Sequence, residues 1–166
     1  VHPLTFASAI GAGDGALPFP VPGMSDVMPY PSATWSSLDA SQLRLYREAW
    51  RAHLAKAVAA AGPDVIHAHH GWIVAAVAKE VAPSVPVVVH THGTALRQLE
   101  LCPHLRDDVI GACRRVDAWA TLHRGQQEEY GRVYGLDAAP VHVVGAGYRE
   151  ELFRSQGAGA RAGVAY

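Results

Sequence analysis

Four histidines stand at alternate positions at the ends of two short apolar runs. His67 and His69 end the first run, and His90 and His92 end the second. Side chains along a β-strand alternate between its two faces, so each pair is expected to share one face of its strand. Imidazole binds transition metals and also hydrogen-bonds polar ligands. The two pairs are therefore the first candidates for a binding site.

The segment between the two runs predicts how these histidines are positioned. Residues Trp72–Ala78 are apolar nearly all round, which is typical of a crossover helix packed on a parallel sheet. Strand, helix and strand then form a βαβ unit, in which ligands bind at the carboxyl ends of the strands. Both histidine pairs and Gly93 fall at those ends, so we expect a site at one edge of the sheet.

The rest of the chain alternates between helical and strand patterns. Apolar residues at steps of three and four after Leu43 predict a long helix, which a capping box of Asp39 and Gln42 begins and Gly62 ends. Beyond the βαβ unit the patterns predict a helix from Pro103, a strand over 116–122, a helix over 124–134 and a strand over 141–144. The fold class expected is α/β, with an open, mostly parallel, Rossmann-like sheet and helices on both faces.

A long proline-rich segment precedes the first predicted helix. Residues 7–37 contain five prolines among aromatic and methionine side chains, and we expect a long loop that either lines a cleft or covers the sheet edge. Within it, Gly11–Ala16 matches the G-x-G-x-x-A pattern of dinucleotide-binding folds. Pro18, Pro20 and Pro22 prevent the helix that this pattern needs, so we reject a nucleotide site there.

Composition narrows the class of protein. The chain has 166 residues, of which 49% are hydrophobic, enough for one core. With 14 basic and 15 acidic residues and no basic block, it has no electrostatic footprint for nucleic acid. No apolar run approaches the roughly 20 residues of a membrane span. Two cysteines, Cys102 and Cys113, are too few for a disulfide framework, so we expect a cytoplasmic protein.

The residues alone raise two kinds of chemistry, metal binding and nucleophilic catalysis. The five histidines of the two runs could form a metal cluster, as in a metal-dependent hydrolase built on the H-x-H pattern, although neither strand offers a carboxylate beside its histidines. These histidines are His67, His69, His70, His90 and His92. A nucleophilic triad is disfavoured, because no serine has a nucleophile-elbow context and neither cysteine has an activating neighbour.

The order of the motifs resembles the amino-terminal domain of the family 4, or group 1, glycosyltransferases of the GT-B architecture. The similarity covers about residues 39–153, and its segments are 63–69 with the apolar helix that follows, 87–94, 113–118 and 141–153. The resemblance implies a retaining transfer from a nucleotide-diphosphate sugar, with no essential metal and no other cofactor. The amino-terminal domain of this family holds the acceptor, and a carboxyl-terminal domain holds the nucleotide.

The resemblance also implies roles for particular residues. His92 matches the family's histidine close to the transferred sugar and is expected to be catalytic, while Gly93 and Thr94 shape the same rim. A neutral imidazole can hydrogen-bond a sugar hydroxyl without changing its charge. To these we add three substrate-binding candidates on the acceptor side: His69, His70 and Trp72.

The chain ends suggest part of a longer protein. We expect residues 1–156 to form the acceptor-side domain without its first strand and helix, and residues 157–166 to be a linker and the start of a second domain. On this interpretation the partners are the sugar donor, the acceptor and the missing carboxyl-terminal domain, and the 166 residues alone do not turn over. A metal-dependent hydrolase and a non-catalytic sugar-binding domain remain alternatives.

Overall fold

A computed structural model describes residues 17–137 and 139–147. In chain order the elements are a 3₁₀ helix η1 (Trp35–Ser37), α1 (Ala40–Ala61), β1 (Ile66–His69), α2 (Ile73–Val81), β2 (Val87–His90), α3 (Thr94–Leu101), α4 (Pro103–Cys113), β3 (Ala118–Thr121), α5 (Arg124–Tyr134) and β4 (Val141–Val143). The G-x-G-x-x-A segment, the 148–153 part of the family resemblance and the expected linker at 157–166 lie outside the described residues.

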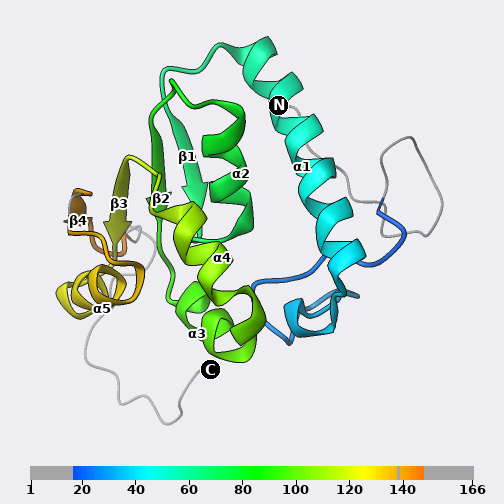
Figure 1. The fold of residues 1–166 in the computed structure, drawn as a ribbon. Coiled ribbons are helices and arrows are strands. Elements are labelled where there is room, and N and C mark those ends of the chain that lie inside the picture. Colours follow the sequence, from blue (N-terminus) through cyan, green and yellow to red (C-terminus); the bar gives the residue numbers. More distant parts are fainter. Residues whose placement is uncertain (1–16, 138, 148–166) are drawn as a thin grey trace, which may run out of the picture.

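The four strands form one parallel sheet in the order β1-β2-β3-β4. The βαβ unit and the α/β class are confirmed, because β1 and β2 are adjacent, run in the same direction and are joined by α2 (Figure 1). In their register His69 lies opposite His90. The two histidine-bearing strands therefore end side by side.

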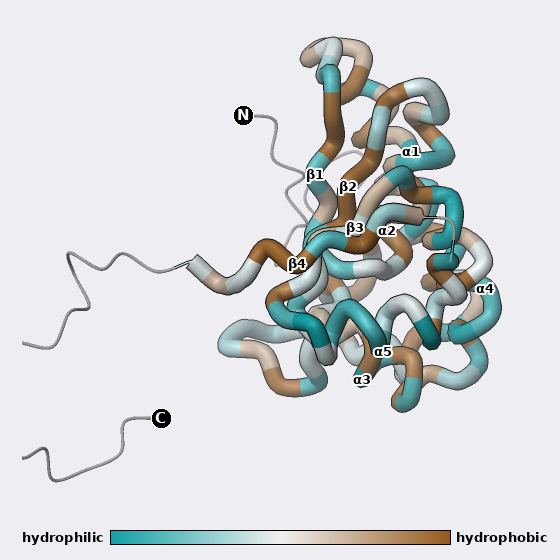
Figure 2. The backbone as a smooth tube through the Cα atoms, turned by 90° about the vertical axis from the view of Figure 1, so that its left-hand side faces the viewer, coloured by the Kyte–Doolittle hydropathy of each residue, from teal (hydrophilic) through white to brown (hydrophobic). Residues whose placement is uncertain are grey.

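The helices of the described residues differ in one respect from the expected arrangement, because they cover a single face of the sheet. Each connection moves the chain to the next strand in the same direction, and right-handed crossovers then place α2, α4 and α5 on the same side. Val87, Val89 and Trp119 point to that side and are buried. In Figure 2 the strands lie to the left and α1, α2 and α4 to their right. The opposite face holds His67, His69 and His90.

Helix α1 has the ends that the sequence predicts. The Asp39 carboxylate accepts from the Gln42 backbone N–H at 2.9 Å, the Gln42 side chain accepts from the Asp39 N–H, and Gly62 closes the helix in the left-handed conformation. The helix packs on α2, outside the layer that covers the sheet (Figure 1). Because of this outer position, only Tyr46 of its apolar stripe is fully buried.

Candidate functional site

The carboxyl ends of β1 and β2 bring together four of the five predicted histidines. These are His69, His70, His90 and His92. The backbone N–H of His70 donates to the carbonyl of His90 at 2.9 Å, which holds the two strand ends in register. The ring centroids of His90 and His92 are 4.8 Å apart, and those of His70 and His92 are 5.0 Å apart. The expected meeting of both runs at one sheet edge is confirmed by this geometry.

A hydrogen bond joins the two histidines at the centre of this edge. His69 Nδ1 lies 2.8 Å from His92 Nε2, and the two rings are nearly parallel, at 17°. One ring must donate and the other accept, so at least one of the pair is neutral. Partial burial, and then the neighbouring His90 and His69 imidazoles, lower the pKa of His92 below its ordinary value. His92 is therefore a neutral imidazole at pH 7.

His70 occupies the sharp turn between β1 and α2. Its φ of 65° makes it the one non-glycine residue with positive φ among the described residues. Its Nδ1 lies 3.0 Å from Thr94 Oγ1, at the start of α3. Burial, followed by the nearby His92 and His69, lowers the pKa of His70 to about 4. The neutral ring thus links β1 to α3, and a strained backbone at a candidate site is a feature that often accompanies function.

Gly93 allows the chain to turn from β2 into α3. Its φ of 83° lies in the left-handed region, and it precedes the first residue of the helix. A Cβ at this position would lie 3.5 Å from the Gln126 amide nitrogen, an ordinary contact, so the backbone conformation rather than crowding explains the glycine. Gly93 and Thr94 therefore lie on the rim where the sequence places them.

Trp72 differs from its expected role on the acceptor side. Its side chain is only 2% exposed, and its ring packs edge-on against Trp35 with centroids 5.6 Å apart. Trp72 is the N-cap residue of α2, and its side chain lies in the hydrophobic core. Its ring therefore offers no face to a sugar, and we remove it from the candidate site.

Two buried glutamines support the edge and were missed from the sequence. Gln126 Oε1 accepts from Thr91 Oγ1 at 2.8 Å and from the Leu122 N–H at 2.9 Å, which ties the end of β2 to the end of β3. Gln98 donates to Asp26 at 3.2 Å and so holds the proline-rich segment against α3. A glutamine in the apolar stripe of the helix predicted over 124–134 is the signal that could have found Gln126. Gln98 lies in α3, a helix that the sequence patterns did not predict.

The proline-rich segment passes the end of the sheet at which the histidines lie. Its described part runs past α3, at the end of the sheet to which the strand arrows point (Figure 1). The backbone of Ala33 bonds to Val21 and to Gly23, which folds the segment back on itself. Asp26 joins the segment to Gln98 of α3, while its apolar side chains Leu17, Phe19 and Val21 pack on the hydrophobic core.

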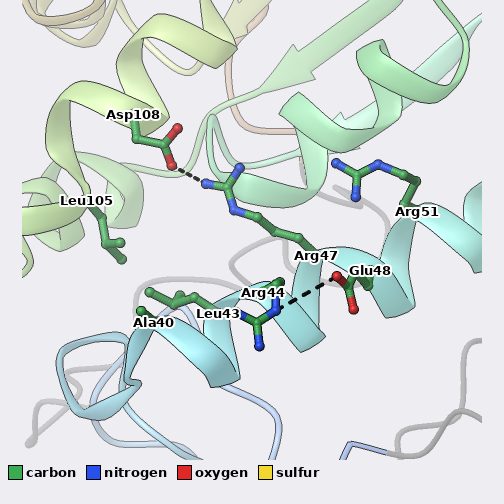
Figure 3. Close-up of a pocket in the computed structure, with 8 residues that line it drawn as sticks. All are labelled: Ala40, Leu43, Arg44, Arg47, Glu48, Arg51, Leu105 and Asp108. Atoms are coloured by element: carbon green, nitrogen blue, oxygen red, sulfur yellow. Dashed lines mark hydrogen bonds and ion pairs between the residues drawn. The ribbon is translucent and has the colours of Figure 1, made fainter.

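A cavity of about 370 Å³ lies elsewhere, between α1 and α4 (Figure 3). Three arginines line it. Arg44 pairs with Glu48 at 4.0 Å, Arg47 pairs with Asp108, and Arg51 pairs at 2.8 Å with Glu80, which lies outside the cavity lining. Each arginine of the lining is thus engaged with a carboxylate. The histidine edge, which gathers the residues predicted from the sequence, therefore remains the candidate site.

Comparison with known families decides the class of this protein. Residues 9–147 match the family described as glycosyl transferase 4-like domain. The chain belongs to this family. The glycosyl transferase 4-like domain thus confirms the resemblance drawn from the motifs, and it favours transferase chemistry over the hydrolase alternative. No curated protein matches the chain. Within the part that the structure describes, no helix has the length and apolar character needed to cross a membrane.

Proposed function

We propose that this glycosyl transferase 4-like domain forms the acceptor side of a cytoplasmic enzyme of the hexosyltransferase type. The enzyme transfers a sugar from a nucleotide-diphosphate sugar to an acceptor with retention of configuration. A second domain binds the nucleotide, and residues 1–156 form the acceptor-side domain. The observation that supports this proposal most is the histidine edge, where His69, His92, His70 and Thr94 meet at the carboxyl ends of two parallel strands.

His92 is the residue that contacts the transferred sugar in this proposal. Its Nε2 is engaged with His69, and its Nδ1 makes no hydrogen bond within the described residues. Because the ring is exposed and neutral at pH 7, Nδ1 can bond a sugar hydroxyl with no change of charge. His69 holds the orientation of the His92 ring, and so determines where that nitrogen points.

The acceptor side is formed by the residues around His92. His70 and Thr94 are bonded to each other across the gap between β1 and α3, and Gly93 lets the backbone approach the rim. The transfer itself uses no metal and no cofactor besides the sugar nucleotide, as the family resemblance implies. Activity that persists after treatment with a chelator is the expected result.

The test is sugar transfer by the full-length protein, measured as nucleoside diphosphate release with a panel of nucleotide sugars and acceptors. His92→Ala should lower the turnover number about ten- to a hundredfold, the effect of losing one hydrogen bond that strengthens in the transition state. His142→Ala is the matched control, since His142 is an exposed histidine on β4 of the same sheet. Its transfer rate should equal that of the wild type.

Two results would contradict the proposal. Wild-type turnover in His92→Ala would remove the role of that residue. Acceptor binding by the full-length protein without any transfer would instead identify a non-catalytic sugar-binding domain.

A further inference from the structure

Three imidazoles lie together on the face of the sheet that the described helices leave open. His67 and His69 come from β1 and are exposed, and His90 comes from β2 and is half-buried. Each offers one ring nitrogen, and the three nitrogens lie within 4.8 Å of one another. The rings of His67 and His90 are stacked, with centroids 5.7 Å apart. Imidazoles this close can share an ion between them.

We infer that His67, His69 and His90 form a binding site for a transition-metal ion that prefers nitrogen ligands, with Zn²⁺ as the best-suited ion. Zinc binds imidazole nitrogen at about 2.0–2.1 Å with tetrahedral geometry, which requires ligand nitrogens about 3.4 Å apart. Rotation of the exposed His67 side chain, which leaves the bond between His69 and His92 intact, can close the remaining gap. Three histidines and one open position also form a known ligand set for zinc.

The composition of the cluster selects the kind of ion. Within the described residues the cluster consists of histidines only, with no carboxylate among its members. Magnesium and calcium require oxygen ligands, so they are excluded, whereas zinc, copper and nickel accept imidazole. The site is therefore expected to discriminate strongly between these two groups of cations.

A second observation in the same cluster is a ring nitrogen that has no partner within the described residues. The Nε2 atom of His90 is buried and has no hydrogen-bond partner in the part of the chain that the structure describes. A buried polar atom without a partner is uncommon and requires an explanation, such as a bound ion or water. An ion held between His67, His69 and His90 would supply that partner.

The hydrogen bond of His69 to His92 prepares His69 as a ligand. When the Nδ1–H of His69 donates a hydrogen bond to His92 Nε2, the free lone pair of the His69 ring is on its Nε2. That nitrogen can then bind an ion. Metal-binding histidines commonly donate from their other nitrogen in this way, which fixes both the tautomer and the ring orientation. The site lies on the sheet face and shares His69 with the proposed function, but zinc binding needs no sugar and can be measured separately from transfer.

The test is metal binding to the full chain, purified without a polyhistidine tag and stripped of metal by a chelator. Calorimetric titration with Zn²⁺ should show one ion bound per chain, and Co²⁺ should give the visible absorption bands of a tetrahedral nitrogen site. A large excess of Mg²⁺ or Ca²⁺ should not displace either ion. His67→Ala should weaken binding at least about tenfold, since even the loss of an outer partner has an effect of that size.

The control is His142→Ala, because His142 lies on the same face but two strands away from His90. That variant should bind zinc as the wild type does. His67 is exposed, so His67→Ala should keep the circular dichroism spectrum of the wild type, which separates loss of a ligand from loss of the fold. The site is disproved if the chain binds no zinc, if His67→Ala binds it unchanged, or if both variants weaken binding equally.

Discussion

The Nδ1 atom of His69 lies 2.8 Å from the Nε2 atom of His92, which joins the last residue of β1 to the segment that follows β2. The bond fixes the His92 ring, which we propose contacts the substrate, to the neighbouring strand β1. It also means that the two histidines should act as a unit in any reaction at this edge.

A double-mutant cycle tests that unit. His69→Ala should lower the turnover number of the full-length protein less than His92→Ala does, because the His92 ring remains but loses its fixed orientation. The double variant should be no slower than His92→Ala alone, since residues of one network are not additive. Transfer rates at saturating substrate give the three values, and strict additivity would show that the bond has no part in transfer.

The left-handed backbone of His70 predicts the effect of substitutions on stability. His70→Gly should be more stable than His70→Ala by about 1 kcal/mol, because glycine adopts a φ of 65° without the steric penalty of a Cβ. Both variants lose the bond to Thr94, so the comparison isolates the backbone. Urea unfolding measures the difference, and equal stability would argue against the left-handed turn.

Gly71 is expected to tolerate no side chain. A Cβ at this position would lie 2.5 Å from the Trp119 ring, which is fully buried, and Gly71 also accepts a hydrogen bond from Tyr134 at 2.7 Å. Gly71→Ala should therefore lower the free energy of unfolding by about 1–3 kcal/mol through overpacking.

The control for that substitution is Gly111→Ala in α4, where an added Cβ meets nothing within 4 Å. It should leave stability unchanged or raise it by up to about 1 kcal/mol, because alanine favours helices. Thermal unfolding of the two variants gives the comparison, and equal effects would refute the close approach of Gly71 to Trp119.

Asp117 should make stability depend on pH. Burial opposes its ionisation, but hydrogen bonds from Lys79 at 2.8 Å and from the Val87 N–H at 2.7 Å outweigh this and lower the pKa of its carboxyl group. The pKa is thus lower in the folded than in the unfolded chain, so the stabilisation is present above about pH 4 and is lost as the pH falls through the folded value.

Asp117→Asn should therefore lower the free energy of unfolding by about 1 kcal/mol at pH 7, a modest effect because the carboxylate is partly exposed. The difference from the wild type should shrink as the pH falls below about 4. Urea unfolding at pH 7 and at pH 3 measures it. Asp107→Asn, on the exposed side of α4, serves as the control. It should leave the free energy of unfolding unchanged at both pH values.

Local signals in the sequence predict much of this fold. The capping box of Asp39 and Gln42, the left-handed glycines Gly62 and Gly135 at helix ends, and the period-two pattern of the histidine strands all depend on near neighbours in the chain. The same is true of the meeting of the two strand ends, since a helical crossover makes the two strands parallel and brings their carboxyl ends to one edge.

Features that depend on distant contacts could not be predicted. An apolar run such as 72–78 does not reveal which of its side chains faces the core, and Trp72 is fixed there by Trp35 from another segment. The one-sided cover of the described sheet follows from strand order, which periodicity does not encode. Likewise, Gln126 and Gln98 are polar residues that sequence patterns place at the surface. They are buried because Thr91 and Asp26, respectively, hydrogen-bond to their side chains.

The consecutive order of the strands has a consequence for how the chain folds. Every strand after β1 pairs with the one synthesised just before it, so each new pairing closes one crossover and awaits no later segment. Compared with a parallel sheet whose neighbouring strands are distant in the chain, this order shortens the sequence separation between paired strands and lets the sheet grow strand by strand during translation. The histidine pairs of β1 and β2 would then meet early, before β3 and β4 leave the ribosome.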